Sequence, residues 1–213
     1  MSLAKFIDST TLQPDCSPEA IQGLCREAME LGFSAVCIPP YYVKEAVSIL
    51  ADSTVAVATV IGFPMGYSST PSKVEEIKRA IDEGADELDV VINVCAVKSG
   101  NWNYVKNDIE STTLAAHLKG KVVKIILETN LLSAEELDRV CSICAKAGVD
   151  FVKTSTGFSG GTTIETIEHL RAALPKVVRI KASGGIRDRA FAEALIAAGA
   201  SRLGTSTGAK IIS

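Results

Sequence analysis

The sequence predicts a (β/α)8 barrel formed by a single domain that spans residues 1–213. Short runs rich in β-branched residues alternate with amphipathic stretches along the whole chain, which is the pattern of a parallel sheet. Eight such runs fit within the 213 residues, and an open doubly wound sheet normally uses fewer strands. No G-x-G-x-x-G or G-x-x-x-x-G-K-[ST] motif follows a predicted strand, which further favours the barrel over the open sheet.

The order of the elements follows from these runs and from the residues that cap them. Strands are predicted at residues 5–10, 35–39, 55–62, 87–94, 122–129, 151–156, 178–184 and 201–206. Helices are predicted at residues 18–31, 42–50, 71–83, 102–118, 134–147, 163–174 and 189–198. Ser17 and Ser133 are typical residues before a helix, and Gly84, Gly148 and Gly199 are typical after one. Each helix is long enough to return the chain to the start of a neighbouring parallel strand.

The composition is that of a globular protein, with 47% hydrophobic and 22% charged residues. No apolar run is long enough to span a bilayer, and residues 1–8 lack the features of a signal peptide. We therefore expect a soluble cytoplasmic protein with no membrane partner. A net charge of −3 and a pI near 5.5 argue against nucleic acid as a partner.

The six cysteines are expected to be free thiols, because a chain of this length has an ample core and does not need disulfides. Cys141 and Cys144 form a C-x-x-C motif within a predicted helix. No second pair of cysteines or histidines accompanies the motif, so a metal or redox role is disfavoured. No metal site is predicted.

Lys153 is the first candidate for chemistry, because it lies inside the β-branched run 151–157. Burying an unpaired ammonium group is so unfavourable that the lysine tends to lose its proton instead. A neutral lysine is a nucleophile toward carbonyl groups, which suggests a residue that forms a Schiff base. The alternative is that the strand lies at an edge, or that the side chain extends its charge to solvent.

Three consecutive predicted strands each carry a lysine at a similar distance from the strand end, namely Lys124, Lys153 and Lys181. Active sites of such barrels lie at the C-terminal ends of the strands, and residues two apart share a face. This rule groups Lys124 with Glu128, and it also places one serine beside each of the other lysines, Ser155 and Ser183. Solvated lysines do not explain the pattern, since barrel strands are covered by helices outside and filled by side chains inside.

If Lys153 and Lys181 both point inward, each disfavours the charge of the other. We expect one of the two to be neutral near pH 7, while the charged neighbour donates a proton. Asp89, on an earlier strand, is the matching carboxylate. It is either a charge partner for a buried lysine or part of a proton relay, and both roles are compatible.

The last two strands end in loops that suit a phosphate group. Gly184 and Gly185 have N–H groups that can approach an anion closely. Ser206 and Thr207 leave the last strand toward a short helix, whose N-terminal amides and hydroxyls suit a phosphate. Each loop alone is compatible with an ordinary turn, but barrels often bind phosphate after strands seven and eight. Together the two loops favour a phosphorylated substrate.

With these residues in place, the sequence resembles the deoxyribose-phosphate aldolase family over nearly the full chain. Members of this family are class I aldolases that cleave 2-deoxy-D-ribose 5-phosphate to D-glyceraldehyde 3-phosphate and acetaldehyde. The resemblance rests on blocks in the family's order: FIDSTTL at 6–12, SAVCIP at 34–39, TVIGFPMG at 59–66, ELDVVIN at 87–93, VKTSTGF at 152–158 and IKASGGIR at 180–187.

The resemblance implies that Lys153 forms the Schiff base, that Lys181 perturbs its pKa and assists proton transfer, and that Asp89 works with water in the proton relay. No metal or organic cofactor is implied, because the iminium is the electron sink. The implied partners are a phosphorylated sugar and aldehydes, and a homodimer is the expected assembly. The implied phosphate-binding residues are Gly157, Gly184, Gly185, Ser206 and Thr207.

The chain also departs from the family pattern. Many members have His where Ser9 stands, the turn at 157–163 is one residue shorter, and a longer tail that ends in tyrosine is missing after residue 213. Two rival functions are another lysine-dependent barrel aldolase with a different aldehyde donor, and a catalytically silent barrel that binds sugar phosphates.

Overall fold

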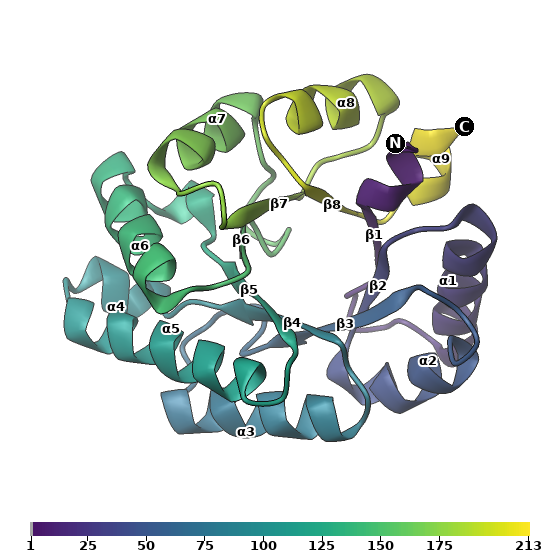
Figure 1. The fold of residues 1–213 in the computed structure, drawn as a ribbon, viewed down its shortest axis with the longest axis horizontal. Helices are drawn as coiled ribbons and strands as arrows, with labels where there is room; N and C mark the ends of the chain where they lie inside the picture. The colour runs from purple at the N-terminus through teal and green to yellow at the C-terminus, as the bar shows by residue number, and fades with distance from the viewer. Residues whose placement is uncertain (1) are drawn as a thin grey trace.

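The predicted (β/α)8 barrel is confirmed by the computed structural model, which describes residues 2–213 (Figure 1). Every strand pairs in parallel with its neighbours in chain order, and β1 pairs with β8 to close the ring. The strands are β1 Ile7–Thr10, β2 Ala35–Ile38, β3 Ala56–Ile61, β4 Glu87–Val91, β5 Val122–Ile126, β6 Phe151–Lys153, β7 Arg179–Ser183 and β8 Arg202–Thr205.

Helices surround the ring of strands (Figure 1). Their bounds are α1 Pro18–Leu31, α2 Val43–Ile49, α3 Thr70–Asp82, α4 Val94–Lys98, α5 Trp102–His117, α6 Ala134–Ala147, α7 Ile164–Ala173, α8 Arg189–Ala197 and α9 Gly208–Ile212. The predictions for α1 and α6 are correct to the residue, because local capping fixes both ends. Ser133 and Glu136 form a capping box at the start of α6, and Gly148 at its end has a left-handed backbone.

The strands are shorter than predicted where polar residues redirect the chain. The prediction of a strand at 87–94 fails after Val91, because the Asn93 side chain accepts a hydrogen bond from the Ala96 N–H and caps α4. The predicted strand 5–10 begins only at Ile7, since a 3-10 helix, η1 Leu3–Phe6, precedes it. Helix α4 was not predicted. The η1 and α9 segments lie side by side (Figure 1).

Two different cores fill the space on the two faces of the barrel wall. Outward-facing strand residues such as Val36, Leu88 and Ile180 pack with the helices in one large apolar cluster. The interior holds a small apolar cluster of Ala35, Cys37, Ala58 and Val60 on the β2–β3 side. Charged side chains from β1 and from β4 to β8 occupy the rest of the interior, together with the buried side chains of Val91, Ile126 and Phe151. The alternation of faces along each strand therefore separates hydrophobic packing outside from chemistry inside.

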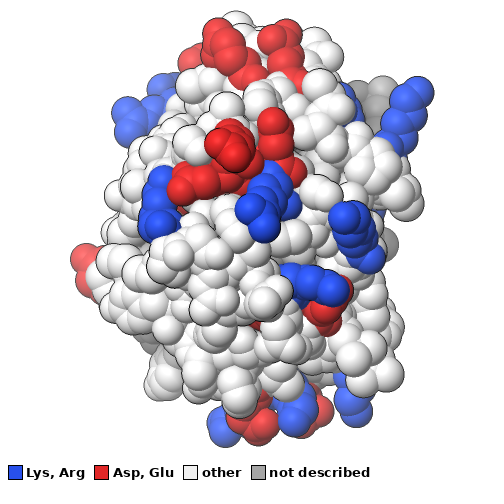
Figure 2. Space-filling view, turned by 90° about the vertical axis from the view of Figure 1, so that its left-hand side faces the viewer, with Lys and Arg blue, Asp and Glu red and all other residues white. Residues whose placement is uncertain are grey.

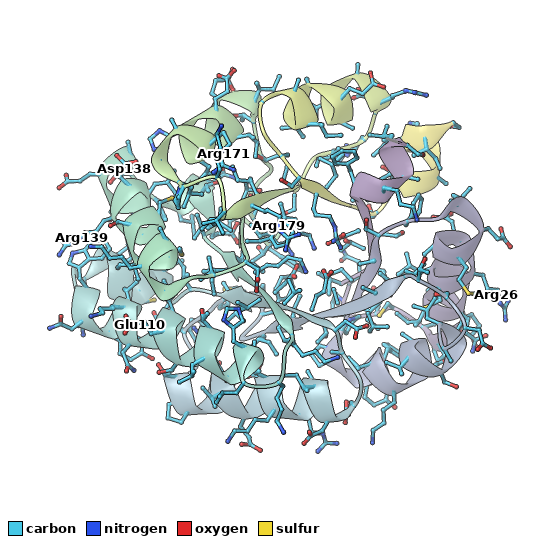
Figure 3. The ribbon with its side chains drawn as sticks, viewed as in Figure 1. Arg26, Glu110, Asp138, Arg139, Arg171 and Arg179 are labelled. Carbon is cyan, nitrogen blue, oxygen red and sulfur yellow. The ribbon has the colours of Figure 1, made fainter. Side chains whose placement is uncertain are left out.

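Polar contacts secure the outer surface of the barrel. Arg171 on α7 donates to the carbonyls of Leu174, Pro175 and Val178, which holds the turn that leads into β7 (Figure 3). On the side covered by α4, α5 and α6, acidic and basic side chains are interspersed (Figure 2).

None of the helices within residues 2–213 combines the length and the hydropathy that crossing a membrane demands.

A buried ion pair joins α3 to α5. Lys73 Nζ lies 2.6 Å from Asp108 Oδ2 and donates to the Val91 carbonyl at 2.8 Å, and the Thr70 hydroxyl donates to the other Asp108 oxygen. Lys73 is fully buried and Asp108 almost so. Because Val91 is the last residue of β4, this pair ties the two helices to the C-terminal end of that strand.

We predict that Asp108→Ala lowers the free energy of unfolding by about 3–5 kcal/mol, because it leaves the Lys73 ammonium buried without its counter-charge. Urea unfolding measures the change. The control is Glu193→Ala, which breaks the exposed Arg189–Glu193 pair and is expected to cost less than about 0.5 kcal/mol. Equal losses in the two variants would contradict the assignment.

Candidate active site

Charged side chains from six of the strands meet inside the barrel. Three are carboxylates and four are cations, and they come from strands on both sides of the closure between β1 and β8. All but Arg202 are buried, and the side chain of Arg202 is 13% exposed. The members of this cluster, called the interior charge cluster below, are Asp8, Glu87, Asp89, Lys124, Lys153, Lys181 and Arg202.

Asp89 lies at the centre of the cluster and accepts from three lysines. Its Oδ1 atom accepts from Lys124 Nζ at 2.8 Å. Its Oδ2 atom accepts from both Lys153 Nζ at 2.9 Å and Lys181 Nζ at 2.8 Å. The predicted grouping of Lys124, Lys153 and Lys181 inside the barrel is thus observed, with Asp89 between them.

The two fully buried lysines each have a second carboxylate, whereas Lys153 does not. Lys124 Nζ lies 2.5 Å from Glu87 Oε2, and Lys181 Nζ lies 2.6 Å from Asp8 Oδ2. Asp89 is the one carboxylate within 4 Å of Lys153 in residues 2–213. Lys153 therefore has the weakest compensation for its charge among the three lysines.

Burial and charge act in opposite directions on the ionisation of this cluster. Burial disfavours the charged form of Asp89, but Lys124, Lys153 and Lys181 outweigh it and hold the pKa of this carboxyl well below its usual range. Burial likewise opposes the charge of Lys181, but Asp8 and Asp89 raise the pKa of its ammonium above the ordinary value. Asp89 is thus an anion and Lys181 a cation near neutral pH.

A cavity of about 340 Å³ opens at the C-terminal ends of the strands. The loops after β1, β6, β7 and β8 line it, and Lys153 is the one member of the interior charge cluster among its lining residues. Asp89 and Lys181 lie beneath, fully buried. Gly204 makes room for this arrangement, because a Cβ atom at that position would lie 3.1 Å from Lys181 Cε. Among the members of the interior charge cluster, Lys153 is therefore the one that a molecule in the cavity can contact.

Four of the five residues implied for phosphate binding, all except Thr207, line this cavity. Gly157, Gly184 and Gly185 have φ values of 94°, 88° and 79°, which suit glycine. Among the hydrogen bonds of the described residues, the N–H groups of these three glycines donate to none. Ser206 also lines the cavity. Thr207 does not, and its hydroxyl instead contacts the Thr205 hydroxyl and the Ile186 carbonyl.

Other expectations from strand alternation are wrong. Glu128 does not join Lys124, since β5 ends at Ile126 and the Glu128 side chain accepts from Thr156 instead. Ser155 lies beyond β6, which ends at Lys153, and it is buried away from the cavity, whereas Ser183 on β7 lines the cavity as Lys153 does. Lys124 also lies lower in the barrel than predicted, because its register partner on β6 is Phe151 rather than Lys153.

Sequence reasoning missed several residues of the site. Asp8, Glu87 and Arg202 complete the interior charge cluster, and the position of Glu87 two residues before Asp89 on β4 was the available signal. Arg187 also lines the cavity. The β1 loop also contributes to that lining, through Thr10, Thr11, Leu12 and Gln13.

The cysteines lie apart from the cavity. Cys37 is fully buried with its Sγ 3.8 Å from Asp89 Oδ2, and burial raises the pKa of its thiol. Cys141 and Cys144 are buried in α6, where burial raises the pKa of Cys141 to about 12 and that of Cys144 well above its ordinary value. Within residues 2–213, no group of three or more His, Cys, Asp or Glu side chains is arranged to hold a metal ion.

A family model, curated relatives and solved structures similar to this chain all include aldolases. A family model described as "DeoC/LacD family aldolase" matches residues 3–213. A deoxyribose-phosphate aldolase of Brevibacillus brevis is 50% identical over 214 residues, which cover 100% of this chain and 96% of the relative. A deoxyribose-phosphate aldolase of Thermococcus gammatolerans is 48% identical, with the same coverage. The solved structure of a tetrameric deoxyribose phosphate aldolase from Aeropyrum pernix matches with a TM-score of 0.92 and 34% identity, covering 99% of this chain and 89% of that one.

We predict that Asp89→Asn lowers the free energy of unfolding by about 3 kcal/mol or more at pH 7, because it leaves three buried lysines without their shared anion. The pKa of Asp89 is lower in the folded state than in the unfolded chain, so its contribution is present above about pH 4 and is lost as the pH falls further. The difference in the free energy of unfolding between wild type and variant should therefore become smaller as the pH is lowered.

Urea unfolding at several pH values between 7 and 3 measures this gap. Asp15→Asn is the control, since Asp15 is exposed and forms no salt bridge within the described residues. A gap that stays constant over the whole pH range would show that Asp89 does not stabilise the fold through its charge.

Proposed function

Because the chain belongs to the DeoC/LacD family of aldolases, we propose that it cleaves 2-deoxy-D-ribose 5-phosphate reversibly through a Schiff base on Lys153. The products are D-glyceraldehyde 3-phosphate and acetaldehyde. The observation that carries the proposal is that Lys153 alone, among the described members of the interior charge cluster, lines the cavity.

The charge balance of the cluster supports Lys153 as the nucleophile. Fully ionised, its three carboxylates and four cations would bury one excess positive charge, which is unfavourable in a low-dielectric interior. Lys124 and Lys181 each have two carboxylate partners, and Lys153 has one. Lys153 is thus the lysine whose use as a nucleophile breaks the fewest ion pairs, and it is the one at the cavity wall.

In the cleavage direction, the lone pair of Lys153 Nζ attacks the aldehyde carbon of the open-chain sugar. Loss of water from the carbinolamine gives an iminium ion. The C3 hydroxyl then loses its proton, the C2–C3 bond breaks, and its electron pair flows to the iminium nitrogen, so that the aldehyde of glyceraldehyde 3-phosphate forms and an enamine remains. Protonation of the enamine at C2 and hydrolysis release acetaldehyde and restore the amine.

Asp89 and Lys181 have separate roles in this scheme. The Lys181 ammonium stays charged near pH 7 and opposes a second charge on Lys153, with which it shares Asp89 Oδ2. The Asp89 carboxylate is a continuous hydrogen-bonded link between the two nitrogens, and with water it passes protons to and from the reacting groups. Lys181 thus acts through charge and through this link, beneath the cavity rather than in it.

The substrate phosphate is proposed to bind at the glycine-rich side of the cavity. The free N–H groups of Gly157, Gly184 and Gly185 point to an anion site of the backbone type. The Arg187 guanidinium supplies positive charge, and Ser206 supplies a hydroxyl. Thr207 can contribute only if its hydroxyl leaves the Ile186 carbonyl. The assembly as a homodimer and the cytoplasmic location stay predictions from the sequence.

Borohydride reduction in the presence of acetaldehyde tests the Schiff base. We predict a stable adduct on Lys153, detected by mass spectrometry of its peptide, and no adduct on Lys124 or Lys181. Lys153→Met should abolish both the adduct and the cleavage of deoxyribose 5-phosphate. An unmodified Lys153 would reject the aldolase mechanism and favour the silent sugar-phosphate-binding barrel.

We predict that Lys181→Leu lowers kcat about 100-fold, because it removes the charge beside Lys153 and one end of the hydrogen-bonded link. The rate should also depend on pH over a different range, since Lys153 loses the cation with which it shares Asp89 Oδ2. Steady-state kinetics from pH 6 to 9 measure both effects, and thermal unfolding checks that the variant is folded. A folded variant with unchanged kcat and an unchanged pH profile would exclude this role.

A further inference from the structure

The backbone leaves regular geometry directly after β5, at Glu128. Among residues 2–213, Glu128 is the one non-glycine residue with a positive φ, 53°, a conformation that costs energy for such a residue. The Leu127 N–H donates to the Lys153 carbonyl, and the Thr129 N–H donates to the Thr154 carbonyl. Between these two hydrogen bonds the chain after β5 advances by two residues, from 127 to 129, while the chain after β6 advances by one, from 153 to 154. This is the arrangement of a β-bulge, which changes the direction of a side chain.

The re-aimed Glu128 carboxylate holds the first residue of the turn that follows β6. It is 3% exposed, and it accepts hydrogen bonds from both the N–H and the hydroxyl of Thr156. The Thr156 hydroxyl oxygen in turn accepts from the Phe158 N–H at 3.1 Å. The N–H of Gly157, which lies between these two, is left without an acceptor among the described residues and belongs to the cavity lining.

Asn130 holds the other end of the same turn. Its Nδ2 atom donates to the carbonyls of Ser159 and Gly161 at 3.2 and 3.0 Å. The turn then rests on the loop after β7, because the Thr162 N–H donates to the Gly184 carbonyl and a Cβ atom on Gly161 would lie 2.7 Å from that oxygen. Two side chains from the β5–α6 connection therefore fix the backbone that presents Gly157 beside Gly184.

We infer that Glu128 and Asn130 are positioning residues that set the preference of this chain for phosphorylated over unphosphorylated sugars. They act through the 156–162 turn, which presents the free Gly157 N–H to the proposed phosphate position, and neither lines the cavity. A carboxylate suits position 128 because it only accepts hydrogen bonds, and both the N–H and the hydroxyl of Thr156 donate to it. The inference rests on the proposed function and adds to it the residues that shape its specificity.

The test compares two substrates, 2-deoxyribose 5-phosphate and 2-deoxyribose, in the same variants. Glu128→Gln keeps the size of the side chain but presents a donor to Thr156, and Asn130→Ala removes the second support. In each variant we expect kcat/KM for the phosphorylated substrate to fall about tenfold more than kcat/KM for the unphosphorylated one, mainly through KM. The inhibition constant of inorganic phosphate against the phosphorylated substrate should rise by a similar factor.

Matched variants separate positioning from general stability. Thr156→Val should show the same selective fall in kcat/KM for the phosphorylated substrate. Thr156→Ser should keep most of the wild-type value, since it keeps the hydroxyl. Thr112→Val is the control, because it removes a buried hydroxyl that bonds within α5, away from the cavity. This control should affect both substrates equally.

Each outcome decides a different point. Equal losses for the two substrates in folded Glu128→Gln and Asn130→Ala would overturn the positioning role while leaving the Schiff base intact. Failure of the wild type to form a borohydride adduct on Lys153 would instead overturn the proposed function. If Glu128→Gln does not fold, Asn130→Ala still decides the inference, because Asn130 is exposed and its loss leaves no buried group unpaired.

Discussion

The carboxylate of Asp89 is the interaction on which the rest of the interior depends. Three lysines from three successive strands donate to its two oxygens, and no two of those lysines could be buried together without an anion between them. The strands that carry them are thereby held at a fixed register. The same carboxylate is the single anionic partner, among the described residues, of Lys153 at the cavity wall.

Space inside the barrel is divided to suit this cluster. Small apolar side chains fill the β2–β3 side, and Gly204 on β8 leaves room for the stem of Lys181. Most of the large hydrophobic strand residues instead lie on the outer face, where the helices cover them. The barrel thus combines a buried, charged interior with a conventional packed shell, and the cavity is the point where the two meet solvent.

Strand alternation was sufficient to predict the eight-stranded barrel and to place Lys153 and Lys181 inside it together with Asp89, because periodicity is a local property. It was not sufficient for Asp8 and Arg202, since their pairing depends on ring closure between the ends of the chain. It was also misleading for Glu128, where a left-handed residue ends the alternation that the rule assumes. Roles that depend on hydrogen bonds between loops, such as those of Asn130 and Thr207, carry no periodic signal at all.

The contact between Asp8 on β1 and Arg202 on β8 joins residues 194 positions apart in the chain, and it has a consequence for folding. Contacts of such long sequence separation form late, because the chain must first lose the entropy of closing a large loop. Until β8 docks, Asp8 and Glu87 lack the guanidinium that they share. The charge cluster around Lys153 is therefore complete only when the ring closes, so that an incompletely synthesised or partly open barrel has the lysine without its full set of charged neighbours.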